Sequence, residues 1–220
     1  MSAADFLDSQ VLLLIGTWLF YFLLHSIFAS LWFKRLVASR WPGLMPAYRL
    51  IFNLCALLLL LPPLYITYQF NGPWLWRWSG AAWWLANGSA LIAVALFYWT
   101  LRYYDSGEFI GLKQWRERVE SVEDQERFHL SPLHRFVRHP WYTLALVLIW
   151  SRDMNLAFLL TAVSITLYFW IGSRLEEKKL MIYHGNAYRM YRERVPGLLP
   201  LPWRYLSRED AEEFERNANR

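Results

Sequence analysis

The sequence predicts an all-α integral membrane protein with about five transmembrane helices and a cytoplasmic helical tail at its C-terminus. Of its 220 residues, 56% are hydrophobic and 19% are aromatic, whereas soluble domains contain roughly 45–50% apolar residues. Several apolar runs reach the length of about 20 residues that crosses a bilayer as a helix. No repeat and no Ser/Gly/Pro-rich linker divides the chain, so we expect a single membrane domain over residues 1–220.

Three apolar runs each suffice for one transmembrane helix, and a fourth suffices for two. The fourth run is interrupted by the polar residues 151–155, which predicts a hairpin whose first helix is short. Pro62 and Pro63 should kink or weaken the second span near its outer end, because proline cannot donate a helical hydrogen bond. In chain order, the runs cover residues 11–33, 48–68, 81–101 and 141–172.

Lysine and arginine gather after the first span and after the last, and this bias predicts the orientation. Cytoplasmic loops of membrane proteins carry an excess of these residues, so the basic linkers and the tail should be cytoplasmic and the N-terminus outside. The formal net charge of +5 then reflects cytoplasmic loops rather than a nucleic-acid partner. An interfacial aromatic belt is predicted in the outer segment, at Trp74, Trp76, Trp78, Trp83 and Trp84.

The polar segments outside the spans should be partly helical. Residues 102–138 have mixed charge and predict a cytoplasmic excursion with one short amphipathic helix. The tail should be helical to about Arg194, with an interruption at Gly185 left open, and should stop at Pro196. A further helix should begin at Ser207, whose hydroxyl can cap it. The only cysteine, Cys55, lies in an apolar run and cannot form an internal disulfide.

Two polar clusters bracket the predicted hairpin. Residues 138–142 (Arg-His-Pro-Trp-Tyr) open it, and Glu176-Glu177 follow where it leaves the membrane. Ionisable groups are costly to desolvate at a bilayer boundary, so this convergence predicts a functional site within residues 131–205. Proline suits the first turn of a helix, which places Arg138 and His139 beside free amides. The alternative is a positively charged anchor followed by a solvated helix.

Three tyrosines extend this candidate site. Tyr142 stands two residues into the hairpin helix, where its ring is able to line an adenine or sulfonium pocket. Tyr188 and Tyr191 are three residues apart and therefore neighbours on one helix face. The alternative for this pair is a surface helix that packs its tyrosines on the bundle.

In this order, residues 138–142, 176–180 (Glu-Glu-Lys-Lys-Leu) and 184–191 (His-Gly-Asn-Ala-Tyr-Arg-Met-Tyr) resemble the isoprenylcysteine carboxyl methyltransferase and phospholipid methyltransferase superfamily. The resemblance implies S-adenosylmethionine bound at the cytoplasmic membrane face, with His139 and Glu177 as catalytic residues. One departure is Leu144, where family members often carry glycine, and it bears on how closely the backbone approaches the cofactor. The cofactor-binding residues that the resemblance implies are Arg138, His139, Tyr142, Glu176, Glu177, Tyr188 and Tyr191.

Segments of the N-terminal half resemble NnrU-type membrane proteins and bacterial methanethiol S-methyltransferases, which implies a bacterial inner membrane protein. Residues 25–30 and Tyr48-Arg49 with Asn53 resemble both groups, and residues 109–114 (Phe-Ile-Gly-Leu-Lys-Gln) resemble the methanethiol S-methyltransferases. A plant carotenoid isomerase branch of the NnrU-like group uses haem, so one alternative is a haem protein with His25 as axial ligand. We expect instead a structural His25 that pairs with Ser26 or with the face of Arg49 and Asn53.

The preferred interpretation is an S-adenosylmethionine-dependent membrane methyltransferase that acts on a small thiol or a lipophilic acceptor arriving through the bilayer. Methyl transfer from a sulfonium is an in-line displacement that needs no metal, so the protein supplies orientation and a dry site. A thiol must lose its proton, and Glu177 or His139 is the nearest base. The rivals are an NnrU-like haem protein with a redox or isomerase role and a non-catalytic membrane scaffold.

Overall fold

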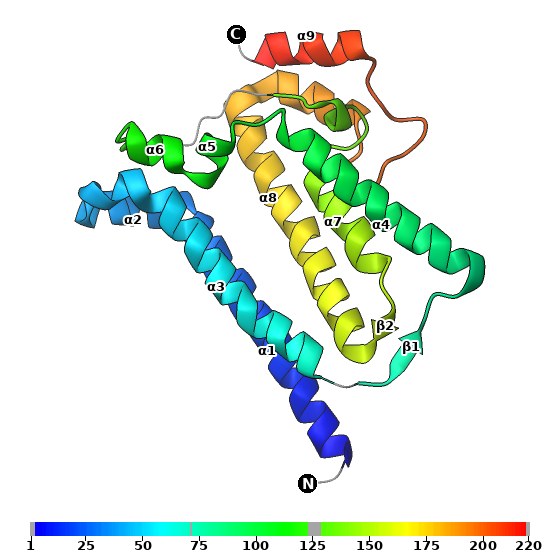
Figure 1. Cartoon of the computed structure of the whole chain (residues 1–220). Helices are drawn as coiled ribbons and strands as arrows, with labels where there is room; N and C mark the ends of the chain where they lie inside the picture. The colour runs from blue at the N-terminus through cyan, green and yellow to red at the C-terminus, as the bar shows by residue number, and fades with distance from the viewer. Residues whose placement is uncertain (1–2, 71, 123–128, 219–220) are drawn as a thin grey trace. The chain divides into compact units, whose positions relative to one another are not determined.

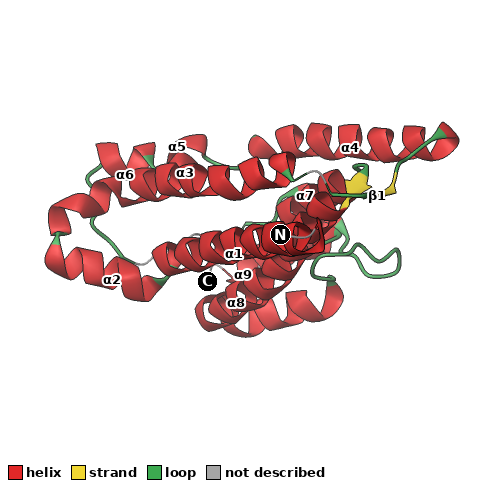
Figure 2. Cartoon of the chain, turned by 90° about the horizontal axis from the view of Figure 1, so that it is seen from below, coloured by secondary structure: helices red, strands yellow, loops and turns green. Residues whose placement is uncertain are grey.

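A computed structural model describes residues 3–70, 72–122 and 129–218 of the chain. Helices dominate these residues (Figure 2), which confirms the all-α membrane fold class. Four of the described helices are long and apolar enough to cross a membrane, and a fifth apolar helix is shorter. They are α1 (Ala3–Ala29), α3 (Tyr48–Gln69), α4 (Gly80–Leu101), α8 (Leu156–Arg194) and the short α7 (Pro140–Trp150).

The chain forms two compact units. The first comprises residues 1–77, 104–124 and 153–164, and the second comprises residues 78–103, 125–152 and 165–220. Each unit draws on distant parts of the sequence, and α8 contributes to both. The single domain expected from the sequence stays a prediction.

In the first unit, α1 and α3 pack along each other (Figure 1). The buried Trp18 indole donates to Thr161 Oγ1 at 3.0 Å, and Thr161 Oγ1 lies 2.8 Å from Thr67 Oγ1. Thr67 in turn donates to the carbonyl of Pro63 at 2.7 Å. Hydroxyl groups paired in this way join apolar helices without leaving a polar atom unsatisfied.

The first helix is shorter at its C-terminal end than the apolar run predicted. It ends at Ala29, and Ser30 caps a separate helix α2 (Leu31–Arg40) by accepting a hydrogen bond from the Phe33 amide at 3.2 Å. The 3-10 helix η1 (Pro42–Ala47) then leads into α3. The run was read as continuous because Ser30 is flanked by apolar residues, although serine is a strong helix N-cap. In α3 the helix continues through Pro62 and Pro63 to Gln69.

The tryptophan-rich outer segment forms a strand that the sequence analysis did not anticipate. Strand β1 (Trp74–Trp76) pairs in antiparallel fashion with β2 (Met154–Asn155), which lies in the polar break of the hairpin. The Leu156 amide also donates to the Pro73 carbonyl at 3.0 Å. Strands of two and three residues leave too little alternation to be recognised from sequence. Trp74 is 54% exposed, whereas the Trp76 indole nitrogen is buried, and the aromatic belt stays a prediction.

Two short helices, rather than the single predicted one, follow the third span. They are α5 (Ser106–Ile110) and α6 (Leu112–Arg116), separated by Gly111 at φ +101°. A Cβ at Gly111 would stand 2.8 Å from Arg49 Cβ, so this turn needs glycine both for its backbone and for its space. Asn53 donates to the Ile110 carbonyl at 2.9 Å, and Figure 2 shows α5 and α6 beside α3.

His25 of α1 lies between two aromatic rings of the first unit. Its ring centroid is 5.7 Å from that of Tyr21 and 5.1 Å from that of Phe52. The Asn53 amide, one of its expected partners, donates to α5 instead. A structural role for His25 stays a prediction.

In the second unit, α4 and α7 lie side by side (Figure 1). Trp141 donates from its indole to Thr100 Oγ1 at 3.0 Å, and its ring packs on Phe97. The buried residues of α4 are small, and small residues allow helix backbones to approach closely in a membrane. These buried positions are Ala86, Ala90, Ala93 and Thr100.

The C-terminal tail turns back on itself at Gly185. This residue has φ +53° and ψ −129°, which are not helical values, so α8 consists of two helical parts. Beyond the turn, Arg192 Nη1 reaches Met181 Sδ at 3.5 Å, which shows that the second part returns along the first. The predicted helix from Ser207 is confirmed as α9 (Arg208–Ala218), and the Ser207 hydroxyl accepts from the Asp210 amide at 3.0 Å.

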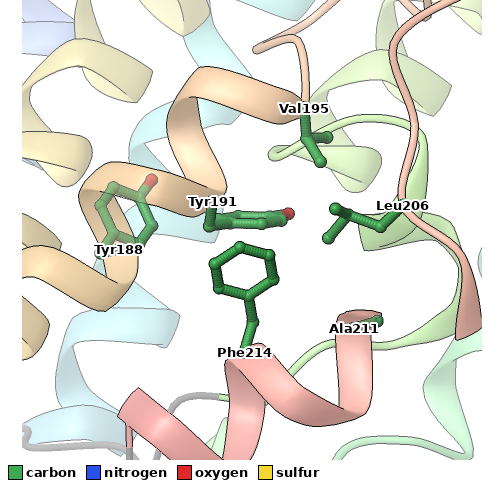
Figure 3. Packing of buried hydrophobic residues seen from close by; sticks show 6 residues of the cluster. All are labelled: Tyr188, Tyr191, Val195, Leu206, Ala211 and Phe214. Carbon is green, nitrogen blue, oxygen red and sulfur yellow. The ribbon is translucent and has the colours of Figure 1, made fainter. Parts of the chain in front are cut away.

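A hydrophobic cluster fixes this tail. The Tyr191 ring of the second part of α8 faces the Phe214 ring of α9, Tyr188 packs beside Tyr191, and aliphatic side chains close the cluster (Figure 3). Burying large aromatic side chains makes the main contribution to such a contact. The cluster consists of Tyr188, Tyr191, Val195, Leu206, Ala211 and Phe214.

Candidate active site

Backbone hydrogen bonds clamp the start of α7 to the segment that follows α8. The amides of Arg138 and His139 donate to the carbonyls of Pro196 and Gly197, at 2.9 and 3.2 Å. Thr143 Oγ1, one turn into the helix, donates to the Leu198 carbonyl at 2.6 Å. These bonds hold the Arg-His-Pro segment against residues 196–198 before the helix begins, and the polar clusters predicted at the two ends of the hairpin meet.

Arg138 and Glu177 form a buried ion pair at the centre of this contact. Arg138 Nε and Nη2 donate to Glu177 Oε1 at 2.9 and 2.6 Å, and the two side chains are 9% and 3% exposed. Arg138 Nη1 also donates to the carbonyls of Arg192 and Val195. The Arg192 carbonyl lies in the last turn of α8, where carbonyls lack a partner within the helix, and Val195 directly follows the helix. Arg138 thus neutralises a buried carboxylate and caps a helix with one guanidinium.

Gly197 makes room for this ion pair. A Cβ at this position would stand 3.3 Å from Arg138 Nη2 and 3.9 Å from Glu177 Oε1. The chain therefore passes directly over the two charged groups.

His139 lies between two carboxylates. Its Nε2 is 3.2 Å from Glu177 Oε1, and its Nδ1 is 3.4 Å from Glu176 Oε2. Burial of the imidazole favours the neutral form, but the hydrogen bonds and charges of Glu176 and Glu177 outweigh burial and raise the pKa of His139. The Glu176 side chain is 50% exposed, whereas that of His139 is 5% exposed. Glu176 therefore forms the accessible edge of the cluster.

Three rings stack beside the charged groups. The planes of His139 and Tyr142 are within 10° of parallel at a centroid distance of 5.5 Å. The planes of Tyr142 and Phe169 are within 5° at 4.6 Å. Stacking holds the imidazole and the phenol in one orientation. Phe169 was not among the predicted site residues, since its place in the apolar run of α8 looks like ordinary membrane packing.

Arg192 joins the cluster from the returning part of α8. Its Nε is 3.2 Å from Glu177 Oε2, and its side chain is 36% exposed. Within the described residues, Glu177 Oε2 is buried and accepts no hydrogen bond of good geometry. Arg192 therefore balances the charge of this oxygen while presenting a cation to the surface.

Tyr188 and Tyr191, predicted to bind the cofactor, are placed in the hydrophobic cluster of the tail, where each is 1% exposed (Figure 3). The Tyr191 hydroxyl donates to the His134 carbonyl at 2.7 Å. Tyr188 is within electrostatic range of Glu177 and Arg138. Packing dominates the surroundings of both rings, and a binding role for them stays a prediction. Leu144 is buried in α7.

The cluster lies where the apolar part of α8 ends. The apolar residues of this helix run to Gly172, and its first charged residue is Arg174. From Leu156 to Glu177 the helix rises about 31 Å, close to the thickness of the hydrocarbon core. The charged groups therefore belong at a membrane boundary.

Comparison of the sequence with those of known proteins identifies the family of the chain. It is 31% identical to the methanethiol S-methyltransferase of Pseudomonas sp. (strain GM41(2012)), and the alignment covers 80% of this chain and 68% of that relative. The chain belongs to the methanethiol S-methyltransferase family. This confirms the resemblance to the isoprenylcysteine methyltransferase-like superfamily that the sequence motifs indicated.

Two methanethiol S-methyltransferases of Bradyrhizobium diazoefficiens are also similar to the chain. The chain is 32% identical to methanethiol S-methyltransferase 1 over 60% of its own length and 49% of the relative. It is 29% identical to methanethiol S-methyltransferase 2 over 80% of its own length and 68% of the relative. No family model matches the chain, and no solved structure matches it.

Proposed function

We propose that this protein is an S-adenosylmethionine-dependent membrane methyltransferase that methylates a small thiol, of which methanethiol is the first candidate. The observation that carries the proposal is the buried cluster of Arg138, His139 and Glu177, which opens to the surface through Glu176 and Arg192. The names of the relatives support the reaction class and the thiol.

The chemistry of the cluster fits the proposed methyl donor. A carboxylate suits the positive charge of a sulfonium and an ammonium group, and the half-exposed Glu176 supplies it. The Arg192 guanidinium suits a carboxylate, because its planar fork donates two parallel hydrogen bonds. The stacked rings of Tyr142 and Phe169 suit an adenine face. When bound, S-adenosylmethionine supplies an electrophilic methyl group.

The protein contributes orientation, water exclusion and a proton acceptor. We assign the acceptor role to His139, because Glu177 is surrounded by Arg138, His139 and Arg192 and a carboxylate so paired is a weak base. Glu176 stabilises the imidazolium that forms when the thiol proton reaches His139. In this proposal Glu177 and Arg138 are positioning residues.

The direct test is a methyl-transfer assay, in which the purified protein in lipid nanodiscs is incubated with labelled S-adenosylmethionine and methanethiol. We expect transfer of a labelled methyl group from S-adenosylmethionine to methanethiol, detected as dimethyl sulfide in the headspace. Calorimetry should show binding of S-adenosylhomocysteine, and Glu176→Gln should weaken it more than Trp203→Ala, an exposed control. A folded wild-type protein that neither binds nor transfers would contradict the proposal.

We also propose that the C-terminus is cytoplasmic and the N-terminus outside. Basic residues concentrate after α1 and in the second part of α8, as cytoplasmic segments do. A fluorescent protein fused after Arg220 should fluoresce, and alkaline phosphatase fused there should be inactive. The opposite pair of results would reverse the orientation.

A further inference from the structure

We propose that α2 is an interfacial helix whose exposed face binds the headgroups of anionic phospholipids. The helix begins directly after α1, the first candidate membrane span, with Ser30 between them as its cap. Its start is thus fixed at a membrane boundary. The proposal concerns the first unit alone and does not depend on methyl transfer.

One face of α2 packs on the protein. Val37 is 8% exposed, and the Phe33 ring lies 5.2 Å from that of Phe28. The Tyr48 hydroxyl donates to the Phe28 carbonyl at 2.5 Å, and Lys34 lies over the Tyr48 ring at 6.0 Å. These contacts fix the rotation of α2 about its axis, and so they determine which side chains point outward.

The outward face combines large apolar side chains with arginines. Trp32 is 68% exposed and Leu36 is 38% exposed, and Arg40 follows them at the same four-residue spacing. Arg35 and Ser39 are exposed beside them. Exposing large apolar side chains to water is unfavourable. The headgroup region of a bilayer accommodates both kinds of side chain, with indole and aliphatic groups at its inner edge and guanidinium groups at its outer edge.

Exposed apolar residues also occur in the elements that pack next to α2. Trp41 is 59% exposed and Leu44 of η1 is 46% exposed. Helix α6, which packs against η1, adds Trp115 at 55%. Exposed apolar residues gathered at one place mark a lipid or protein contact. Their arrangement along the end of a membrane span favours lipid.

Charge complementarity selects the kind of lipid. The sequence contains no aspartate or glutamate between Ser30 and Leu50, whereas it contains Lys34, Arg35, Arg40 and Arg49 there. Basic residues next to a membrane span attract anionic headgroups, at about 1 kcal/mol for each residue. The occupant is therefore a phospholipid with a net negative headgroup, such as phosphatidylglycerol.

The first experiment measures lipid binding. Native mass spectrometry of the purified full chain, titrated with phosphatidylglycerol or phosphatidylcholine, should show preferential retention of phosphatidylglycerol. The variant Arg35→Gln/Arg40→Gln should weaken this retention about fivefold for each arginine. The matched control Arg189→Gln/Arg208→Gln removes two exposed arginines of the tail and should leave the retention unchanged. Equal retention by wild type and the Arg35/Arg40 variant would overturn the proposal.

The second experiment measures depth and does not depend on affinity. A spin label at Ser39→Cys in a Cys55→Ala background should show the oxygen accessibility of a headgroup region in phosphatidylglycerol nanodiscs. A label at Glu212→Cys on α9 provides the aqueous reference. A Ser39 label as accessible to water as the α9 label would overturn the proposal, and would leave an acidic protein as the partner of this face.

Discussion

Replacing Arg138 with methionine should destabilise the protein more than substitution of an exposed arginine, lowering the free energy of unfolding by about 3–5 kcal/mol. The reason is that Glu177, 3% exposed, would lose the guanidinium that holds its Oε1. The carbonyls of Arg192 and Val195 would lose their donor at the same time. The free energy of unfolding is measured by denaturant titration in mixed micelles, followed by circular dichroism.

Two further variants separate the buried charge from a general loss of an arginine. Arg189→Met breaks the exposed pair with Glu193, whose side chains are 72% and 66% exposed, and should cost at most about 1 kcal/mol. Arg138→Met/Glu177→Met removes both charges and should recover part of the lost stability, because no unpaired carboxylate remains. A double variant as unstable as the sum of its single variants would show that the ion pair is not the cause.

Replacing His139 with glutamine should lower thiol methylation about 10²–10⁴-fold, the range expected when a general base is removed. In the wild type the carboxylates raise the pKa of His139 above 6.5. Only the neutral imidazole accepts a proton, so kcat/KM should rise with pH and level off above this raised pKa. Glu176→Gln removes one negative charge from Nδ1, which lowers the pKa of His139 and moves the inflection to lower pH.

The direction of the Glu176→Gln shift distinguishes a base from a merely structural histidine. A rate lost equally at every pH, with no moved inflection, would make Glu176 itself the proton acceptor. His129→Gln serves as the matched control, because His129 is 44% exposed and pairs with Glu215. Its pH profile should equal that of the wild type. Binding of S-adenosylhomocysteine by His139→Gln should be measured beside the rates, so that lost binding is not mistaken for lost chemistry.

The helices of this protein follow from local sequence. The apolar runs are long enough to bury their backbone amides in a bilayer, and this requirement fixes α3, α4 and the α7–α8 hairpin within a few residues. Pro140 and Ser207 mark helix starts, and Gly185 marks an interruption, through properties of single residues. Ser30 carried the same kind of signal for α2, but the long apolar run around it concealed the cap.

The composition of the polar cluster was also readable, since Arg138, His139, Glu176 and Glu177 are ionisable residues at the ends of an apolar hairpin. The sequence did not show which of these side chains contact one another. Arg192 follows Glu177 by fifteen residues in the sequence and reaches it only because the chain reverses at Gly185. Likewise Phe169 joins the ring stack only through the register of α7 against α8.

The sequence by itself thus determined the membrane class, the helices and the residue types of the candidate site, because hydrophobic length, helix capping and desolvation cost are local properties. Tertiary structure decided the roles within the site. It made Arg138 a buried clamp, turned Tyr191 into the packing of the tail, and left Glu176 and Arg192 as the accessible charges. These outcomes depend on which carbonyls and carboxylates the folded chain brings within hydrogen-bonding distance, and no periodicity in the sequence records that.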